Sequence, residues 1–117
     1  MVAFDHLSRQ QFMPVSELAK MKSWDHPGVR MADVHEHLEP EHLQRVAVGV
    51  AEAGRVREPL HIGWPSAQEG DPHRQGHGEP WVYDGHHRAA AAIAQGLTEV
   101  PVRHDTTTGW MKRYYGY

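Results

Sequence analysis

A run of polar and charged residues, Asp84-Gly85-His86-His87-Arg88, separates an apolar segment from an alanine-rich one. Arginine carries a rigid fork of N–H donors that matches phosphate oxygens, and histidine donates or accepts a proton near neutral pH. The carboxylate of Asp84 can ligate a metal ion or act as a general base. These residue types at this spacing predict a phosphate-binding corner with acid–base or metal chemistry beside it.

The residues on either side of this run indicate the elements that must hold it. Residues 81–83 are aromatic or β-branched, as in a buried strand, and Asp84-Gly85 is typical of a sharp turn. The alanine-rich segment 86–95 has the strongest helix propensity in the chain, and Gly96 is suited to end it. The free N–H groups and the dipole of a helix N-terminus favour a bound anion. The same residues also fit an ordinary surface helix that Asp84 caps, with solvated histidines beside it.

The order of these features resembles the ParB/sulfiredoxin superfamily. In that family a Gly-x-x-Arg corner leads into a helix, a glycine and a strand that opens with an apolar-Pro-apolar step. Here the corresponding residues are 85–88, Gly96 and Val100-Pro101-Val102, and the segment 50–62 is similar to the family's helix end, glycine and proline-led strand. The resemblance covers residues 38–103, a little over half of the chain, in the family's order.

This resemblance implies an α/β (α+β) fold, ParB/sulfiredoxin-like, with a small mixed sheet and packed helices. It also implies a nucleoside triphosphate, ATP or CTP, neutralised by Mg²⁺. Gly85 would let the backbone approach the phosphates, and Arg30 lies in a region where the family often carries an arginine near the nucleotide. The residues that the resemblance assigns to the nucleotide are Gly85, His86, His87, Arg88 and Arg30.

The chemistry that the resemblance implies is phosphoryl transfer or hydrolysis, because similar proteins include ParB CTPases, free-serine kinases and ParB-like nucleases. Such catalysis consists mostly of positioning and charge stabilisation. Asp84 and His86 are the candidates for proton or metal work, with Asp84 as the metal ligand, and Glu58 is a further candidate base. The alternative is a catalytically inactive binding module of a phage or mobile element that acts through a protein or nucleic-acid partner.

Composition excludes several classes of protein. The chain has 117 residues, which suits a single domain over residues 1–117, and it has no cysteine. Sulfiredoxins carry a catalytic cysteine in this corner, so repair of sulfinic acids is excluded. The net charge of −3 argues against a broad basic surface for duplex DNA, although eleven histidines would add positive charge below about pH 6.5. Because no apolar run is long enough to span a membrane, we expect a cytoplasmic protein without membrane contact, whose partners are a nucleotide and either non-specific DNA or a host protein.

Other segments have weaker signals. The spacing of apolar residues predicts a helix over 40–53 that starts at Glu39-Pro40 and ends at Gly54. We expect strands over 57–62 and 99–104, a long loop over 63–80, and peripheral segments over 1–12 and 106–117, with a short edge strand at 11–15 and an aromatic, basic tail at 110–117. A helical turn over 16–21 would be capped by Ser16. Two interpretations of the neighbouring histidines stay open, a metal-binding trio and a solvated loop; these residues are His35, His37 and His42.

Overall fold

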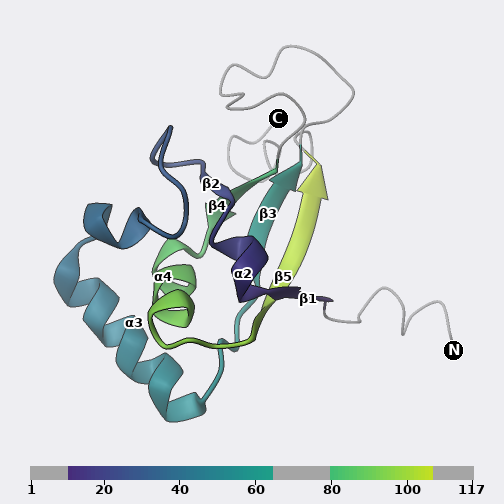
Figure 1. Ribbon diagram of the computed structural model, residues 1–117. Coiled ribbons are helices and arrows are strands. Elements are labelled where there is room, and N and C mark those ends of the chain that lie inside the picture. Colours follow the sequence, from purple (N-terminus) through teal and green to yellow (C-terminus); the bar gives the residue numbers. More distant parts are fainter. Residues whose placement is uncertain (1–10, 65–79, 107–117) are drawn as a thin grey trace, which may run out of the picture.

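The computed structural model describes residues 11–64 and 80–106, which form a five-stranded mixed sheet with helices packed against it (Figure 1). The strand order is β1-β5-β3-β4-β2. β1 pairs with β5 and β3 with β4 in antiparallel fashion, whereas β3–β5 and β2–β4 are parallel. The strands are Gln11–Pro14 (β1), Lys22–Ser23 (β2), Leu60–Trp64 (β3), Trp81–Asp84 (β4) and Glu99–Thr106 (β5). The expectation of a small mixed sheet is confirmed.

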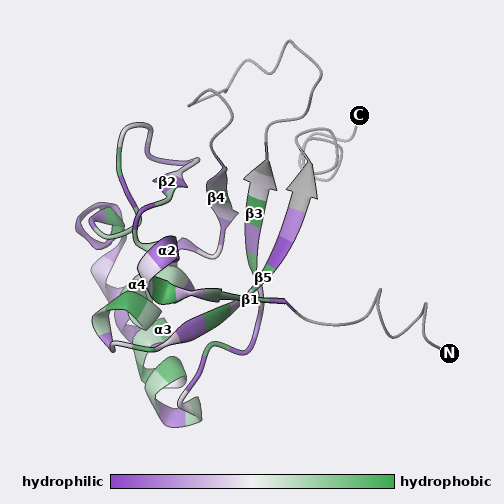
Figure 2. Cartoon of the chain, turned by 45° about the vertical axis from the view of Figure 1, so that its right-hand side comes forward, coloured by the Kyte–Doolittle hydropathy of each residue, from purple (hydrophilic) through white to green (hydrophobic). Residues whose placement is uncertain are grey.

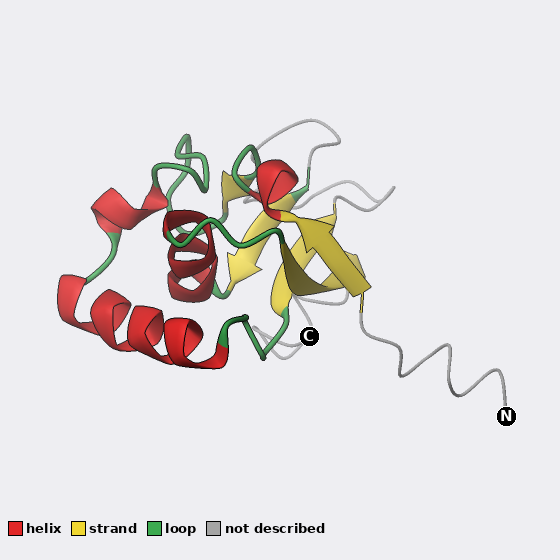
Figure 3. Cartoon of the chain, turned by 60° about the horizontal axis from the view of Figure 1, so that its bottom comes forward, coloured by secondary structure: helices red, strands yellow, loops and turns green. Residues whose placement is uncertain are grey.

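The helices of the described ranges are α2 (Val15–Leu18), α3 (Pro40–Ala53) and α4 (His86–Ala94), with a 3-10 turn, η1, at Val34–His37. α4 packs against α3 on one side and against the sheet on the other (Figure 3). Its residues Ala89 to Ala92 are all buried, and Figure 2 shows hydrophobic colour on α4 and on the part of the sheet beside it. Small side chains let α4 approach both neighbours, which explains why this helix is so rich in alanine.

Alternation along β4 divides the apolar residues between the two faces of the sheet. Val82 belongs to the main core, together with residues of β3, β5 and the helices. Trp81 and Tyr83 point to the opposite face, since neighbouring side chains of a strand alternate, and they form a second cluster with Trp24. The rings of Trp24 and Trp81 are stacked, with centroids 5.1 Å apart. β4 is therefore buried on both faces and gives the corner that follows it a rigid base.

The helix predicted over 40–53 has these bounds in the structure. Its N-terminal cap is Glu39, whose carboxylate accepts hydrogen bonds from the backbone N–H groups of Glu41 and His42 at 3.1 and 2.8 Å. At the other end Gly54 has a φ of 72°, and its N–H donates to the carbonyl of Val50 at 2.8 Å. This left-handed ending is the reason why a glycine stands there. The helix predicted over 86–95 is also confirmed, and it ends one residue earlier, at Ala94.

Several predicted boundaries are wrong. The strand expected over 57–62 is Leu60–Trp64, because its ladder with β5 begins where Leu60 pairs with Val102. Gly63 and Trp64, expected in the loop, extend that ladder. β5 likewise continues beyond residue 104, as far as Thr106. The short edge strand expected at 11–15 is confirmed as β1, which ends one residue earlier, at Pro14.

The predicted cap of the first helical turn is also wrong. α2 begins at Val15, its N-cap is Pro14, and no side chain caps it. The N–H of Val15 donates to the carbonyl of Thr98 at 2.9 Å, which ties the start of α2 to the residue before β5. Within residues 11–64 and 80–106, none of the helices has the length and apolar character that crossing a membrane would require. The expectations for most of the loop and for the aromatic tail concern residues outside these ranges.

Candidate functional site

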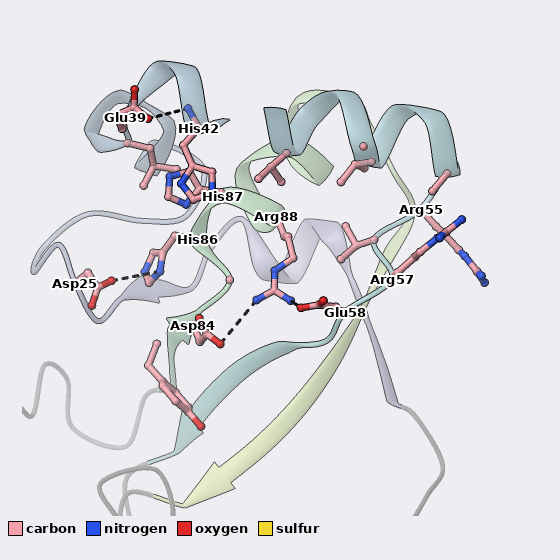
Figure 4. A pocket seen from close by; sticks show the side chains of 18 of the residues that line it. Asp25, Glu39, His42, Arg55, Arg57, Glu58, Asp84, His86, His87 and Arg88 are labelled. Atoms are coloured by element: carbon pink, nitrogen blue, oxygen red, sulfur yellow. Dashed lines mark hydrogen bonds and ion pairs between the residues drawn. The ribbon is translucent and has the colours of Figure 1, made fainter. Parts of the chain in front are cut away.

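A pocket of about 1000 Å³ opens between α3 and the N-terminus of α4 (Figure 4). The segment after α3, residues 55–58, and the loop after β2, with Asp25 and His26, complete its wall. Four of the residues that line it, 85–88, come from the corner between β4 and α4. The corner predicted from the sequence therefore lies on the wall of this pocket.

The corner depends on the backbone conformation of Gly85. This residue is the N-cap of α4 and has φ 98° and ψ 24°, a left-handed conformation that side chains other than hydrogen disfavour. A Cβ atom at this position would lie 2.6 Å from Cδ2 of Leu60 and 3.2 Å from Nη2 of Arg88. In the described part of the chain, no side chain caps α4. The interpretation in which Asp84 caps this helix is thus wrong, because Gly85 occupies the capping position.

Arg88 gathers two of the predicted catalytic residues around its guanidinium group (Figure 4). Its Nη1 lies 3.3 Å from Oε2 of Glu58 and donates to the carbonyl of Pro59 at 3.2 Å. Its Nη2 lies 3.8 Å from Oδ2 of Asp84. Asp84 also approaches the ring of His61, at 3.9 Å. One charged cluster on the pocket therefore contains Glu58, Asp84 and Arg88. Glu58 joins it from 30 positions before Arg88 in the chain.

His86 points in a different direction, toward the loop after β2 (Figure 4). It is 6% exposed, with its Nε2 2.8 Å from the hydroxyl of Ser23 and its Nδ1 3.6 Å from Oδ2 of Asp25. Burial lowers the pKa of His86 below its ordinary value, against the opposing effect of the Asp25 carboxylate. The carboxylate favours a proton on Nδ1, so that Nε2 accepts from the Ser23 hydroxyl. Both ring nitrogens thus face protein groups.

His87 packs against α3 rather than against His86. Its ring is stacked on that of His42, with centroids 4.0 Å apart and an interplanar angle of 25°. Its Nε2 atom is buried and has no hydrogen-bond partner among residues 11–64 and 80–106. Burial, and next the neighbouring His42, lower the pKa of His87. The stacked rings of His42 and His87 therefore join the first turn of α3 to the first turn of α4 at the edge of the pocket.

Not every predicted site residue reaches the pocket. Arg30 donates from Nη1 to the carbonyl of Lys20 at 2.8 Å and is not among the residues that line it. The possible metal trio is divided, since His42 stacks on His87 while the ring of His37 lies 5.3 Å from that of His26. Over residues 11–64 and 80–106, no group of three or more side chains is arranged to hold a metal ion.

Sequence reasoning missed Ser23 and Asp25 completely. They lie more than sixty positions before His86 in the chain and reach it only because β2 pairs with β4, at Lys22–Trp81 and Ser23–Val82. A two-residue strand has no periodic pattern, and a lone Ser-x-Asp is too common to indicate a site.

No protein-family model matches the chain, and no curated protein matches it either. The resemblance to the ParB/sulfiredoxin superfamily therefore depends on the motifs alone, and the function has to be argued from the pocket.

Proposed function

We propose that the protein is a nucleotide-binding domain of the ParB/sulfiredoxin type, with the phosphates of a nucleoside triphosphate bound at the N-terminus of α4. The observation that carries this proposal is the uncapped N-terminus of α4, which Gly85 presents to a pocket of about 1000 Å³. The unsatisfied N–H groups and the positive end of the helix dipole attract an anion there. Arg88, in the first turn of the helix, adds a guanidinium group to the same pocket.

The order of the elements supports the family part of the proposal. Gly85 leads into α4, Gly96 follows the helix with a φ of 68°, and Val100-Pro101-Val102 lies in β5. Upstream, α3 ends at Gly54 and leads to β3. Both halves of the motif therefore fall on elements of the expected type, in the expected order.

The pocket also has room for more than phosphates. From the corner it continues along α3, where Leu38, Val46 and Val50 line it. A volume of this size is within the range of small-molecule sites, which combine apolar walls with a few polar groups. We assign the apolar part to the base and ribose of ATP or CTP.

The charges of the pocket fit a nucleotide that binds together with a cation. Five carboxylates line it against three guanidinium groups, which gives a net charge of −2 when the histidines are neutral; these residues are Asp25, Glu39, Glu52, Glu58, Asp84, Arg55, Arg57 and Arg88. This excess of negative charge weakens the binding of phosphate in the absence of a cation. Mg²⁺ is commonly held by one or two carboxylates together with substrate phosphates, so Asp84 fits as its ligand. When bound, the ion supplies positive charge that neutralises the phosphates.

Phosphoryl transfer or hydrolysis, as in an NTPase, a kinase or a ParB-like nuclease, is the reaction we propose for this site. Arg88 would hold a phosphate oxygen, and the exposed carboxylates of Asp84 and Glu58 are placed to accept a proton from an attacking hydroxyl or water. His86 would contribute its backbone N–H and hold the corner in place, because its ring nitrogens face Ser23 and Asp25.

A thermal-shift screen against ATP, ADP, CTP and GTP, with and without Mg²⁺, tests the proposed function. Binding to the folded state raises the melting temperature, and the rise grows with ligand concentration once this exceeds the Kd. We expect at least one triphosphate to do so in the presence of Mg²⁺, whereas no shift with any of the four would contradict the proposal.

Both ring nitrogens of His86 contact protein groups, Ser23 and Asp25, and this favours a second candidate function without catalysis. That function is a catalytically inactive binding module of a phage or mobile element that acts on a host protein or on DNA. Nucleotide binding without turnover in Mg²⁺ or Mn²⁺ would identify this second function.

A further inference from the structure

The guanidinium group that the proposed function assigns to phosphate already has an anionic partner. Nη1 of Arg88 lies 3.3 Å from Oε2 of Glu58, and this contact has the geometry of both a hydrogen bond and an ion pair. Asp84 is a weaker second partner, 3.8 Å from Nη2. A carboxylate oxygen therefore occupies the donor that a phosphate oxygen would use, because arginine binds both groups through the same N–H fork.

The two sides of this ion pair are held very differently. The side chain of Arg88 is 22% exposed and also donates to the backbone carbonyl of Pro59, which fixes the guanidinium group at the edge of the pocket. The side chain of Glu58 is 83% exposed. Ion pairs with an exposed partner contribute little to stability, since solvent screens them and holding the side chain costs entropy. The carboxylate can thus leave at low cost while the guanidinium group stays in position.

We propose that Glu58 is a built-in competitor for phosphate at Arg88, so that an anion binds only by displacing this carboxylate. The inference depends on the proposed function, because it concerns the same pocket and the same arginine. It makes Glu58 a residue that determines specificity. Ligands with no more charge than a carboxylate, such as acetate, gain little from the exchange, whereas the concentrated charge of a di- or triphosphate displaces Glu58.

Isothermal titration with inorganic pyrophosphate in EDTA, and in parallel with ATP in EDTA, measures this competition without any metal contribution. The variant is Glu58→Gln, which keeps the shape of the side chain and removes its charge. The matched control is Glu52→Gln, which removes one charge from the α3 side of the same pocket. Because Glu58 is exposed, we expect the variant to fold, and its melting temperature checks this.

We expect Glu58→Gln to lower the Kd of whichever probe binds by about two- to fivefold, the scale of one exposed ion pair, and Glu52→Gln to lower it by less. Equal or weaker binding by Glu58→Gln, or an equal gain in both variants, would overturn the competitor role and leave the proposed function intact. If neither probe binds to the wild type or to Glu58→Gln, the competitor role is overturned, and if the nucleotide screen also fails, the proposed function falls with it.

Discussion

Gly85 stands where the backbone turns from β4 into α4, and among glycines 28, 49, 54, 85 and 96 it is the one where an added Cβ would meet other atoms within 4 Å. An added Cβ would combine a positive φ with a 2.6 Å approach to Leu60. We expect Gly85→Ala to lower the free energy of unfolding by about 1–3 kcal/mol, the scale of a strained conformation combined with overpacking. Urea unfolding measures the change.

The control for this substitution is Gly49→Ala in the middle of α3, where a Cβ would meet nothing within 4 Å. Alanine is favoured over glycine inside a helix by about 0.5–1 kcal/mol, so this variant should be slightly more stable than the wild type. Equal effects of the two substitutions would show that the corner is not strained.

A substitution at Asp84 can distinguish a structural role of this residue from a chemical one. It does not cap α4, and its side chain is half exposed next to Arg88. Asp84→Asn should therefore change the free energy of unfolding by less than about 1 kcal/mol while it abolishes Mg²⁺-dependent turnover of the nucleotide. Chemical denaturation and a phosphate-release assay provide the two readouts. Full turnover in the variant would remove Asp84 from the site.

At the scale of elements, the short strand β2 is connected to α4 through a buried hydrogen bond. The Ser23 hydroxyl is 2.8 Å from Nε2 of His86 and also accepts from the N–H of His26 at 3.1 Å. Ser23→Ala would leave buried polar groups unsatisfied, so we expect a loss of about 1–3 kcal/mol in the free energy of unfolding. Ser16→Ala, at the predicted cap that the structure does not use, should change stability far less.

The sequence predicts those elements whose conformation is determined by residues close together in the chain. The apolar spacing and the terminal glycine define α3, and the alanine run defines α4. β2 could not be predicted from the sequence, because it consists of two residues whose partners in β4 lie about sixty positions later. The same division applies to the site. Residues 84–88 are contiguous and stand out as a motif, whereas Ser23 and Asp25 reach His86 only through the pairing of β2 with β4.

At the scale of the whole molecule, buried histidines make stability depend on pH. Burial lowers the pKa of both His86 and His87 below the ordinary value of 6.5. Between the lowered pKa of the folded state and 6.5, the unfolded chain therefore binds more protons than the folded one. This contribution is fully present above pH 6.5 and is lost as the pH falls through the lowered values of the folded state. Urea unfolding at about pH 8 and about pH 5.5 should therefore show a less stable protein in acid.

Two variants check the origin of this pH dependence. His87→Gln should reduce the loss of stability in acid, because the half-buried ring stacked on His42 is no longer there to be protonated. His35→Gln, at an exposed position, should leave the loss unchanged. Identical pH profiles for the wild type and His87→Gln would contradict the assignment.

The central claim is that nucleotide phosphates bind to the backbone at the N-terminus of α4. Amide NMR of the ¹⁵N-labelled protein, titrated with the triphosphate that gives the largest thermal shift in Mg²⁺, tests it most directly. We expect the largest saturable chemical-shift changes at the N–H groups of residues 85–88, with smaller ones along the pocket face of α3. Shifts that cluster elsewhere while the amides of 85–88 stay unchanged would contradict it.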